Sequence, residues 1–238
     1  MKKLYYAFAL LITALLFMSC TKGATGPAGA DASAGLIKAS FVQGVLPDAS
    51  YSGESDTRIY NAAAAENYGT CSDTVVGISN GVWRGLIKFG SISTYIPSNA
   101  TINKAELRLY VYNIAGNPSA KVYGATKSWT EGTGGCGGNS STGASWNYYS
   151  YPTVWQNPGG DYSLSPASPD VQITTTGQYY TFEVPVSLVQ SWLSGESNNL
   201  GLLVMADDET SGVTKYFAYN NKEAGSPMPE LDVYYTLN

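Results

Sequence analysis

Histidine is entirely missing from this chain of 238 residues, and its absence excludes several kinds of site. A Ser-His-Asp triad needs an imidazole as its general base, so catalysis of that type cannot occur. Charged residues make up only 13% of the sequence, about half the usual share. The formal net charge is −5 without a basic run, so nucleic acid is a poor candidate partner, because its recognition rests on phosphate neutralisation.

Tyrosine and small polar residues take the place of the missing charges. The chain contains 19 Tyr and 26 Gly, and 44% of its residues are hydrophobic. Its length is ample for a sizeable core, and no change in composition marks a second domain. This balance is typical of an extracellular β-protein that is rich in strands and turns.

The first 19 residues resemble a bacterial lipoprotein signal peptide. Lys2 and Lys3 precede an apolar run that is too short for a comfortable membrane span, and Ser19 then precedes Cys20. The resemblance implies that Cys20 is lipidated and becomes the new N terminus, which anchors the chain to the envelope, most simply at the surface of an outer membrane. The alternative is a plain secretory signal that is cut nearby.

Two segments follow the signal peptide. Residues 20–36 are rich in glycine and predict a flexible tether, and residues 37–238 form the predicted folded domain. Within that domain Cys71 and Cys136 are the two remaining cysteines, and in an exported protein they predict one disulfide. Two cysteines without a histidine cannot form a standard structural zinc site.

Short strands separated by turn residues cover the folded domain. One short helix is expected after Pro185, where Leu188 and Trp192 would share a face and Gly195 would end it. This pattern predicts an all-β fold, an antiparallel β-sandwich of jelly-roll type. The predicted strands are Ala39–Val42, Thr57–Tyr60, Thr74–Gly77, Arg84–Phe89, Ala105–Tyr112, Lys121–Lys127, Tyr179–Val184, Gly201–Ala206, Lys215–Tyr219 and Glu230–Thr236.

Strand periodicity suggests a candidate binding face. From Ala105 to Tyr112 apolar residues alternate with Glu106, Arg108, Tyr110 and Tyr112, so one side of the strand faces the core. By the same parity we expect further charged and aromatic residues on this outer surface, namely Arg84, Lys88, Lys121, Tyr123 and Lys127. Guanidinium groups bind carboxylates and aromatic rings pack on sugars, which favours a ligand site. An ordinary solvated face with cross-strand ion pairs is the alternative.

A second group of aromatic residues lies in the Gly- and Pro-rich segment 146–162. Tyr148, Tyr149 and Tyr151 are expected to be exposed and available for recognition, whereas Trp146 and Trp155 are expected to be structural. The acids of the turns suggest a calcium site only weakly, because their spacing fits no EF-hand loop, and solvated turn acids are expected instead. These acids are Asp161, Asp207, Asp208 and Glu209.

Several phrases in a fixed order resemble the DNRLRE-type domain, a β-sandwich family that includes carbohydrate-binding module family 96. The resemblance covers roughly residues 40–236, although Arg58 departs from the family pattern and the two cysteines are not part of it. The phrases that carry the resemblance are Gly44–Gly53, Asp56–Ile59, Asn67–Gly69, Val76–Gly77, Arg84–Phe89, Ala100–Tyr110, Trp129–Gly132, Ala144–Trp146, Pro158–Asp161, Val189–Gly195, Asn198–Leu203 and Pro229–Tyr234.

The resemblance implies a sandwich that binds polysaccharide without catalysis or cofactor, with acidic glycans as candidate ligands. The alternative is a structural or adhesive surface protein that contacts other proteins or its own copies. A glycosidase or lyase is the weakest of the three hypotheses. The residues that we assign to ligand binding are Arg84, Lys88, Arg108, Tyr110, Tyr112, Tyr123, Tyr149 and Tyr151, and no metal site is expected.

Overall fold

β-strands dominate the computed structural model, which describes residues 35–139 and 141–238. The predicted signal peptide, the lipidation of Cys20 and most of the tether lie outside the described residues. Within them, no helix is both long enough and apolar enough to cross a membrane. The predicted all-β sandwich with a short helix is confirmed.

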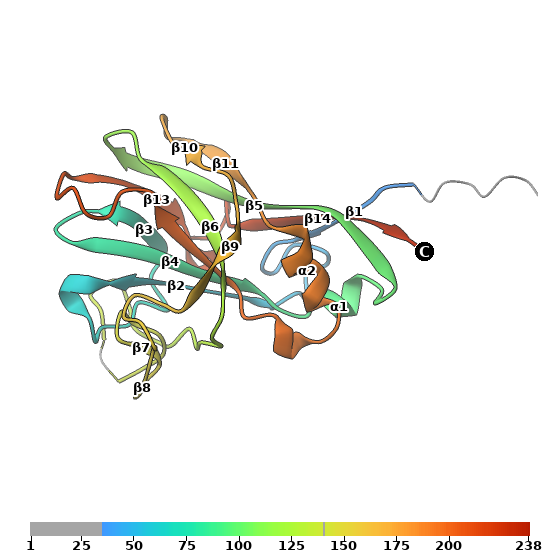
Figure 1. Cartoon of the computed structure of the whole chain (residues 1–238), viewed down its shortest axis with the longest axis horizontal. Coiled ribbons are helices and arrows are strands. Elements are labelled where there is room, and N and C mark those ends of the chain that lie inside the picture. Colours follow the sequence, from blue (N-terminus) through green and yellow to red (C-terminus); the bar gives the residue numbers. More distant parts are fainter. Residues whose placement is uncertain (1–34, 140) are drawn as a thin grey trace, which may run out of the picture. The chain divides into compact units, whose positions relative to one another are not determined.

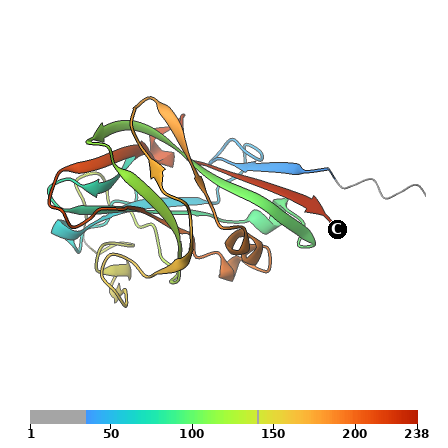
Figure 2. The ribbon, with the colours of Figure 1, turned by 45° about the horizontal axis from the view of Figure 1, so that its top comes forward.

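One large antiparallel sheet curls so that its two halves face each other (Figure 1). In the first half β5 is central, with β11 on one side and β14 and β13 on the other. The strands of this half are β1 (Ile37–Phe41), β3 (Asp73–Ile78), β5 (Ala100–Ala115), β11 (Gln178–Glu183), β13 (Lys215–Asn220) and β14 (Glu230–Leu237). At the edge β1 pairs with β14, which Figure 2 shows beside the C terminus.

The second half is built around β4 and β12, and the β3–β4 hairpin joins it to the first. Its strands are β2 (Glu54–Tyr60), β4 (Val82–Phe89), β6 (Ser119–Ala125), β9 (Tyr162–Ala167), β10 (Val171–Gln172) and β12 (Leu202–Ala206). A separate hairpin lies in the long connection before β9, with β7 (Tyr148–Ser150) and β8 (Thr153–Val154).

Helical segments are short and lie between the strands. They are the α-helices α1 (Ile92–Tyr95) and α2 (Val186–Trp192) and the 3₁₀ turns η1 (Asn61–Ala63), η2 (Glu196–Asn198) and η3 (Lys222–Ala224). The predicted helix after Pro185 is α2, and it packs against β5 through the fully buried Trp192.

Two apolar clusters hold the fold together. The larger one fills the space between the halves of the sheet, where Leu107, Leu109 and Val111 of β5 are fully buried, as their alternation predicts. The smaller one lies on the outer side of the second half, where the connection between β6 and β9 covers Leu86 with Trp129 and Trp155. Both sides of that half are therefore buried. The alternation of residues along its strands separates the two sides but does not show that both are covered.

The long connection is fastened at Asn67, which is fully buried. Its amide nitrogen donates to the carbonyl oxygens of Glu131 and Ala144 at 2.6 and 2.7 Å. Its amide oxygen accepts the N–H groups of Gly69 and Gly134 and the hydroxyl of Thr142. Every hydrogen-bonding position of this one side chain is thus used to hold two loops together.

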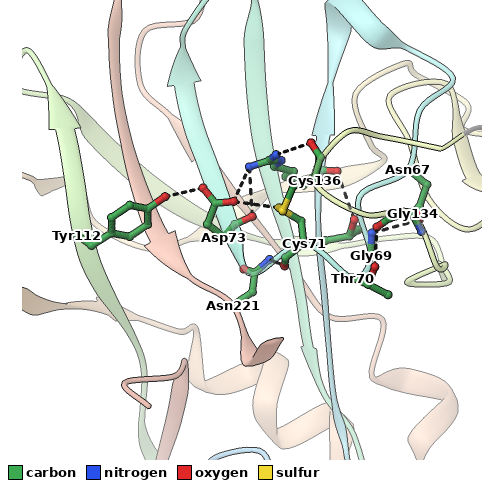
Figure 3. The surroundings of a disulfide bond; sticks show 11 residues. Asn67, Gly69, Thr70, Cys71, Asp73, Tyr112, Gly134, Cys136 and Asn221 are labelled. Carbon is green, nitrogen blue, oxygen red and sulfur yellow. Dashed lines mark hydrogen bonds and ion pairs between the residues drawn. A yellow bond between two sulfur atoms is a disulfide. The ribbon is translucent and has the colours of Figure 1, made fainter. Parts of the chain in front are cut away.

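The disulfide predicted between Cys71 and Cys136 is confirmed, and it crosslinks the same loop beside Asn67 (Figure 3). Cys71 is fully buried just before β3, whereas Cys136 lies in the glycine-rich part of the connection. The disulfide and the hydrogen bonds of the Asn67 amide thus both attach the β6–β9 connection to the segment before β3.

The buried carboxylate of Asp232 in β14 is expected to stabilise the fold. It accepts hydrogen bonds from Ser40 at 2.5 Å and from Lys38 at 2.8 Å, and although burial opposes ionisation, these bonds lower its pKa below 3.8. We expect Asp232→Asn to reduce the free energy of unfolding by about 1–3 kcal/mol at pH 7. A lowered folded-state pKa stabilises above the unfolded value, so the difference should shrink as the pH falls below 3.8.

Urea unfolding at pH 7 and at pH 3 measures both effects for Asp232→Asn. Asp170→Asn is the matched control, because its ion pair with Lys121 is exposed and contributes about 0.5 kcal/mol at most. Equal losses for the two variants at pH 7 would contradict the role given to Asp232.

Candidate functional site

The polar and aromatic residues that alternate with the core residues of β5 lie on its outer face. Arg108, Tyr110 and Tyr112 all point away from the main core, and successive members are roughly 7 Å apart along the strand. These three predicted site residues therefore share one face of the first half of the sheet. That face is the candidate site.

Neighbouring strands extend this row of side chains. Tyr179 of β11 lies opposite Tyr110 in the register, and their rings meet edge to face at 5.4 Å. The Arg108 guanidinium lies 4.7 Å from the centre of the Tyr179 ring, and its Nη1 pairs with Glu230 at 2.6 Å. The arginine is held in place by these contacts, while about one third of its side chain remains exposed.

A groove of about 190 Å³ adjoins the row at Tyr112. Its aromatic walls are Tyr112, Tyr216 and Trp83, and its polar floor consists of Arg58 and Asp73. Arg58 comes from β2 and Trp83 from β4, so the two halves of the sheet build the groove together. Its volume is smaller than the roughly 300 Å³ of the smallest pockets for whole ligands, which suits one ring of a longer molecule.

The floor of the groove is rigid because Arg58 is held from several sides. Its guanidinium lies 5.0 Å from the ring centres of both Tyr68 and Trp83. Nη1 pairs with Asp73 at 2.8 Å, and Nη2 donates to the carbonyl oxygen of Cys136 at 3.3 Å (Figure 3). The loop closed by the disulfide thereby helps to fix the charge at the base of the groove.

Tyr112 is oriented by the same carboxylate. Its hydroxyl donates to Asp73 at 2.5 Å, and burial together with this hydrogen bond raises the pKa of the phenol. The residue is 43% exposed, so its hydroxyl is tied down while part of its surface remains open. Such a fixed ring is suited to packing against the C–H surface of a polar ligand.

The single basic and aromatic surface predicted from strand parity does not form. Arg84 and Lys88 of β4 lie on the outer side of the second half of the sheet, with Leu86 between them in the smaller apolar cluster. Arg108 lies on the outer side of the first half, and the main core separates the two sides. The three cations therefore do not converge on one groove.

Arg84 is also covered. Nε and Nη2 pair with the Glu209 carboxylate at 3.0 and 2.7 Å, and Nη1 donates to the carbonyl oxygen of Gly159 at 2.7 Å. The guanidinium packs against the rings of Trp146 and Tyr162. Arg84 thus fastens two loops to the sheet, the β6–β9 connection through Gly159 and the β12–β13 loop through Glu209, and Lys88 beyond it is half-buried.

The remaining predicted residues also lie with this connection. Tyr123 packs against Tyr162 at 5.1 Å, and Tyr149 packs against Trp155 at 5.9 Å, both as part of the smaller apolar cluster. Tyr151 is 42% exposed, whereas Tyr148 and Tyr149 are only half-exposed. Trp155 is buried, in agreement with its predicted structural role.

The turn acids behave as local structure. Asp161 accepts the backbone N–H groups of Gln156 and Asn157, and Asp208 accepts those of Thr210 and Ser211. Glu209 is engaged with Arg84. Asp161 is buried, which the expectation of solvated turn acids did not foresee.

The groove residues other than Tyr112 were not assigned to a site from the sequence. Arg58 departs from the family pattern, and that departure is the sequence signal for its position in the groove. Tyr216 and Tyr179 follow the same strand parity as Tyr110 and Tyr112, but their placement depends on strand order, which parity does not give.

Comparisons with known proteins assign no family to the chain. No family model matches it, and a search of curated proteins finds no match. The resemblance to DNRLRE-type domains therefore stays a hypothesis, and the functional argument rests on the geometry of the face.

Proposed function

We propose that this chain is a lipid-anchored surface protein whose sandwich binds polysaccharide through the outer face of β5, without catalysing a reaction. The observation that carries the proposal is the groove between Tyr112, Tyr216 and Trp83, with Arg58 and Asp73 at its base. Aromatic walls around fixed polar groups are what a sugar ring needs, because it presents both C–H surfaces and hydroxyl groups.

The row of side chains beyond the groove supports an extended ligand. Tyr110 and Arg108 follow Tyr112 along β5 over roughly 13 Å, so a chain of sugars could lie along the strand with one ring in the groove. The exposed part of Arg108 favours a carboxylated glycan, since its guanidinium donors can bind a uronate. Acidic polysaccharides such as alginate are therefore the first ligands to try.

We expect Tyr112→Ala to weaken glycan binding about tenfold or more, because truncating a central aromatic contact typically costs at least 1–2 kcal/mol. Affinity electrophoresis of the full chain through gels containing alginate, pectin or a neutral glucan measures the effect. Tyr151→Ala is the matched control, because this tyrosine is equally exposed but belongs to the β7–β8 hairpin region on the other side. The control should migrate like the wild type.

Two results would overturn the proposal. One is a wild-type chain that none of the three polysaccharides retards. The other is equal retardation of the wild type and Tyr112→Ala, which would move any binding away from this face. Assembly that depends on protein concentration without glycan would instead support the adhesive alternative.

A further inference from the structure

A group of buried acids lies on the inner side of β2, beyond the groove residue Arg58. Glu54 and Asp56 are two residues apart on this strand, so their side chains point to the same side. They are 3% and 0% exposed, opposite the core residues Phe89 and Ile87 in the register. Carboxylates at such positions are unusual, because burial removes the water that stabilises their charge.

Three carboxylate oxygens of this group are without a partner in the described part of the chain. They are both oxygens of Glu54 and Oδ1 of Asp56. The second oxygen of Asp56 accepts only the backbone N–H of Lys222, at 3.1 Å. Buried polar groups in native proteins are almost always satisfied, so this set of orphaned oxygens calls for an occupant.

Two further acids complete the cluster. Glu131 comes from the β6–β9 connection and Glu223 from η3, and one oxygen from each lies within 4.8 Å of the others and of Asp56. Glu54 is close enough to interact with both Asp56 and Glu223. Four carboxyl groups thus meet from three separate segments of the chain.

Positive charge at the cluster is insufficient. Lys222 pairs with Glu131 and lies 3.4 Å from Glu223, which leaves four acids facing one ammonium group, a net −3 when all are ionised. Arg58, on the same side of β2, is already engaged by Asp73. Burial keeps water away from Glu54 and Asp56, so the carboxylates lack enough compensating charge.

We propose that Asp56, Glu131 and Glu223 bind a calcium ion, with the Glu54 carboxylate beside it as a fourth acidic group. A site made only of carboxylate oxygens selects a hard divalent cation, and it offers neither imidazole nor thiolate to a transition metal. Calcium fits better than magnesium, because it accepts irregular sets of six to eight oxygens, whereas magnesium demands octahedral geometry and keeps its waters. The ion would join β2, η3 and the loop that carries Cys136.

The test is calcium titration of the full chain after treatment with a chelator, followed by calorimetry and by thermal unfolding. We expect about one calcium ion per chain, a dissociation constant of about 10⁻³ M or lower and a higher Tm with calcium than with the chelator. The absence of both heat and a Tm shift would overturn the proposal, and so would a response to magnesium alone.

Variants separate a cation site from a structural network of acids. Asp56→Asn should lose the calcium response at least tenfold and, because it removes a buried charge, should match or exceed the wild-type Tm in chelator. Glu223→Gln changes a less buried acid and should also lose affinity. Glu183→Gln changes an exposed acid of β11 and is the control that should keep it. A normal calcium response in Asp56→Asn would refute the assignment.

Substitution of Lys222 provides a further, independent test of the calcium site. If its ammonium now substitutes for part of the missing cation charge, Lys222→Met should bind calcium more tightly than the wild type, by severalfold. In a network that needs no ion, the same substitution would lower the Tm equally with calcium and with chelator. None of these readouts involves glycan, so they are independent of the function proposed for the groove.

Discussion

Asn67→Ala is expected to lower the free energy of unfolding by about 3–5 kcal/mol, one of the largest single-residue effects in this protein. The substitution leaves five buried or part-buried partners of one amide without their hydrogen bonds. Urea unfolding should show a lower midpoint with an unchanged m value, because the defect lies in the folded state.

One other variant distinguishes the hydrogen bonds of Asn67 from its volume. Asn67→Asp keeps the size but places a carboxylate oxygen against the carbonyl oxygens of Glu131 and Ala144, so we expect it to be at least as destabilising as Asn67→Ala. If Asn67→Asp were near wild type in stability, the amide would not be the fastening point.

Two glycines of the same loop test how closely it packs on Asn67. A Cβ at Gly134 would lie 2.0 Å from the carbonyl oxygen of Asn67, whereas a Cβ at Gly137 would meet nothing within 4 Å. Gly134→Ala should therefore cost about 1–3 kcal/mol and Gly137→Ala almost nothing.

Removal of the disulfide should produce a loss of similar size by a different route. The bridge closes a loop with a sequence separation of 65 residues, and the chain-entropy relation gives about 4 kcal/mol for Cys71→Ala combined with Cys136→Ala. Because the unfolded chain becomes less restricted, the m value should rise, in contrast to the Asn67 variants.

Either single cysteine variant should match the double variant, since each one breaks the bridge. The wild type in a reducing agent should approach the same stability. A double variant within about 1 kcal/mol of the oxidised wild type would show that the folded loop needs no crosslink. Glycan binding should also weaken. The backbone carbonyl group at position 136 accepts a hydrogen bond from Arg58 at the base of the groove, and release of the loop would withdraw this support.

The sequence was a good guide to strands and a poor guide to which surfaces stay open. All ten predicted strands are present, and the alternation in β5 correctly assigned its buried side. The segments β7–β10 were missed because they are short or, in β9, contain Pro166. Parity gives Arg84 the correct side of β4, but it cannot tell that Gly159 and Glu209, which lie 75 and 125 residues further along the chain, would cover it.

The buried acids were missed for a different reason. The predicted strand begins at Thr57, whereas β2 begins at Glu54, so Glu54 and Asp56 lie outside the prediction; acidic residues are depleted in strands. Acidic side chains are mostly solvated, whereas the structure buries both of these. A pattern that contradicts local propensity in this way often marks a functional or strained position.

The register of the edge strand determines how the domain would carry a mechanical load. Ile37, at the start of β1, pairs with Tyr235 of β14, which in turn lies opposite Ile102 of β5. Tyr112 at the groove is ten residues further along β5, roughly 33 Å away. A pull between the two acts along the strands, across hydrogen bonds that run perpendicular to them. The five residue pairs between β1 and β14 would therefore share the force in shear, instead of opening one after another like a zipper.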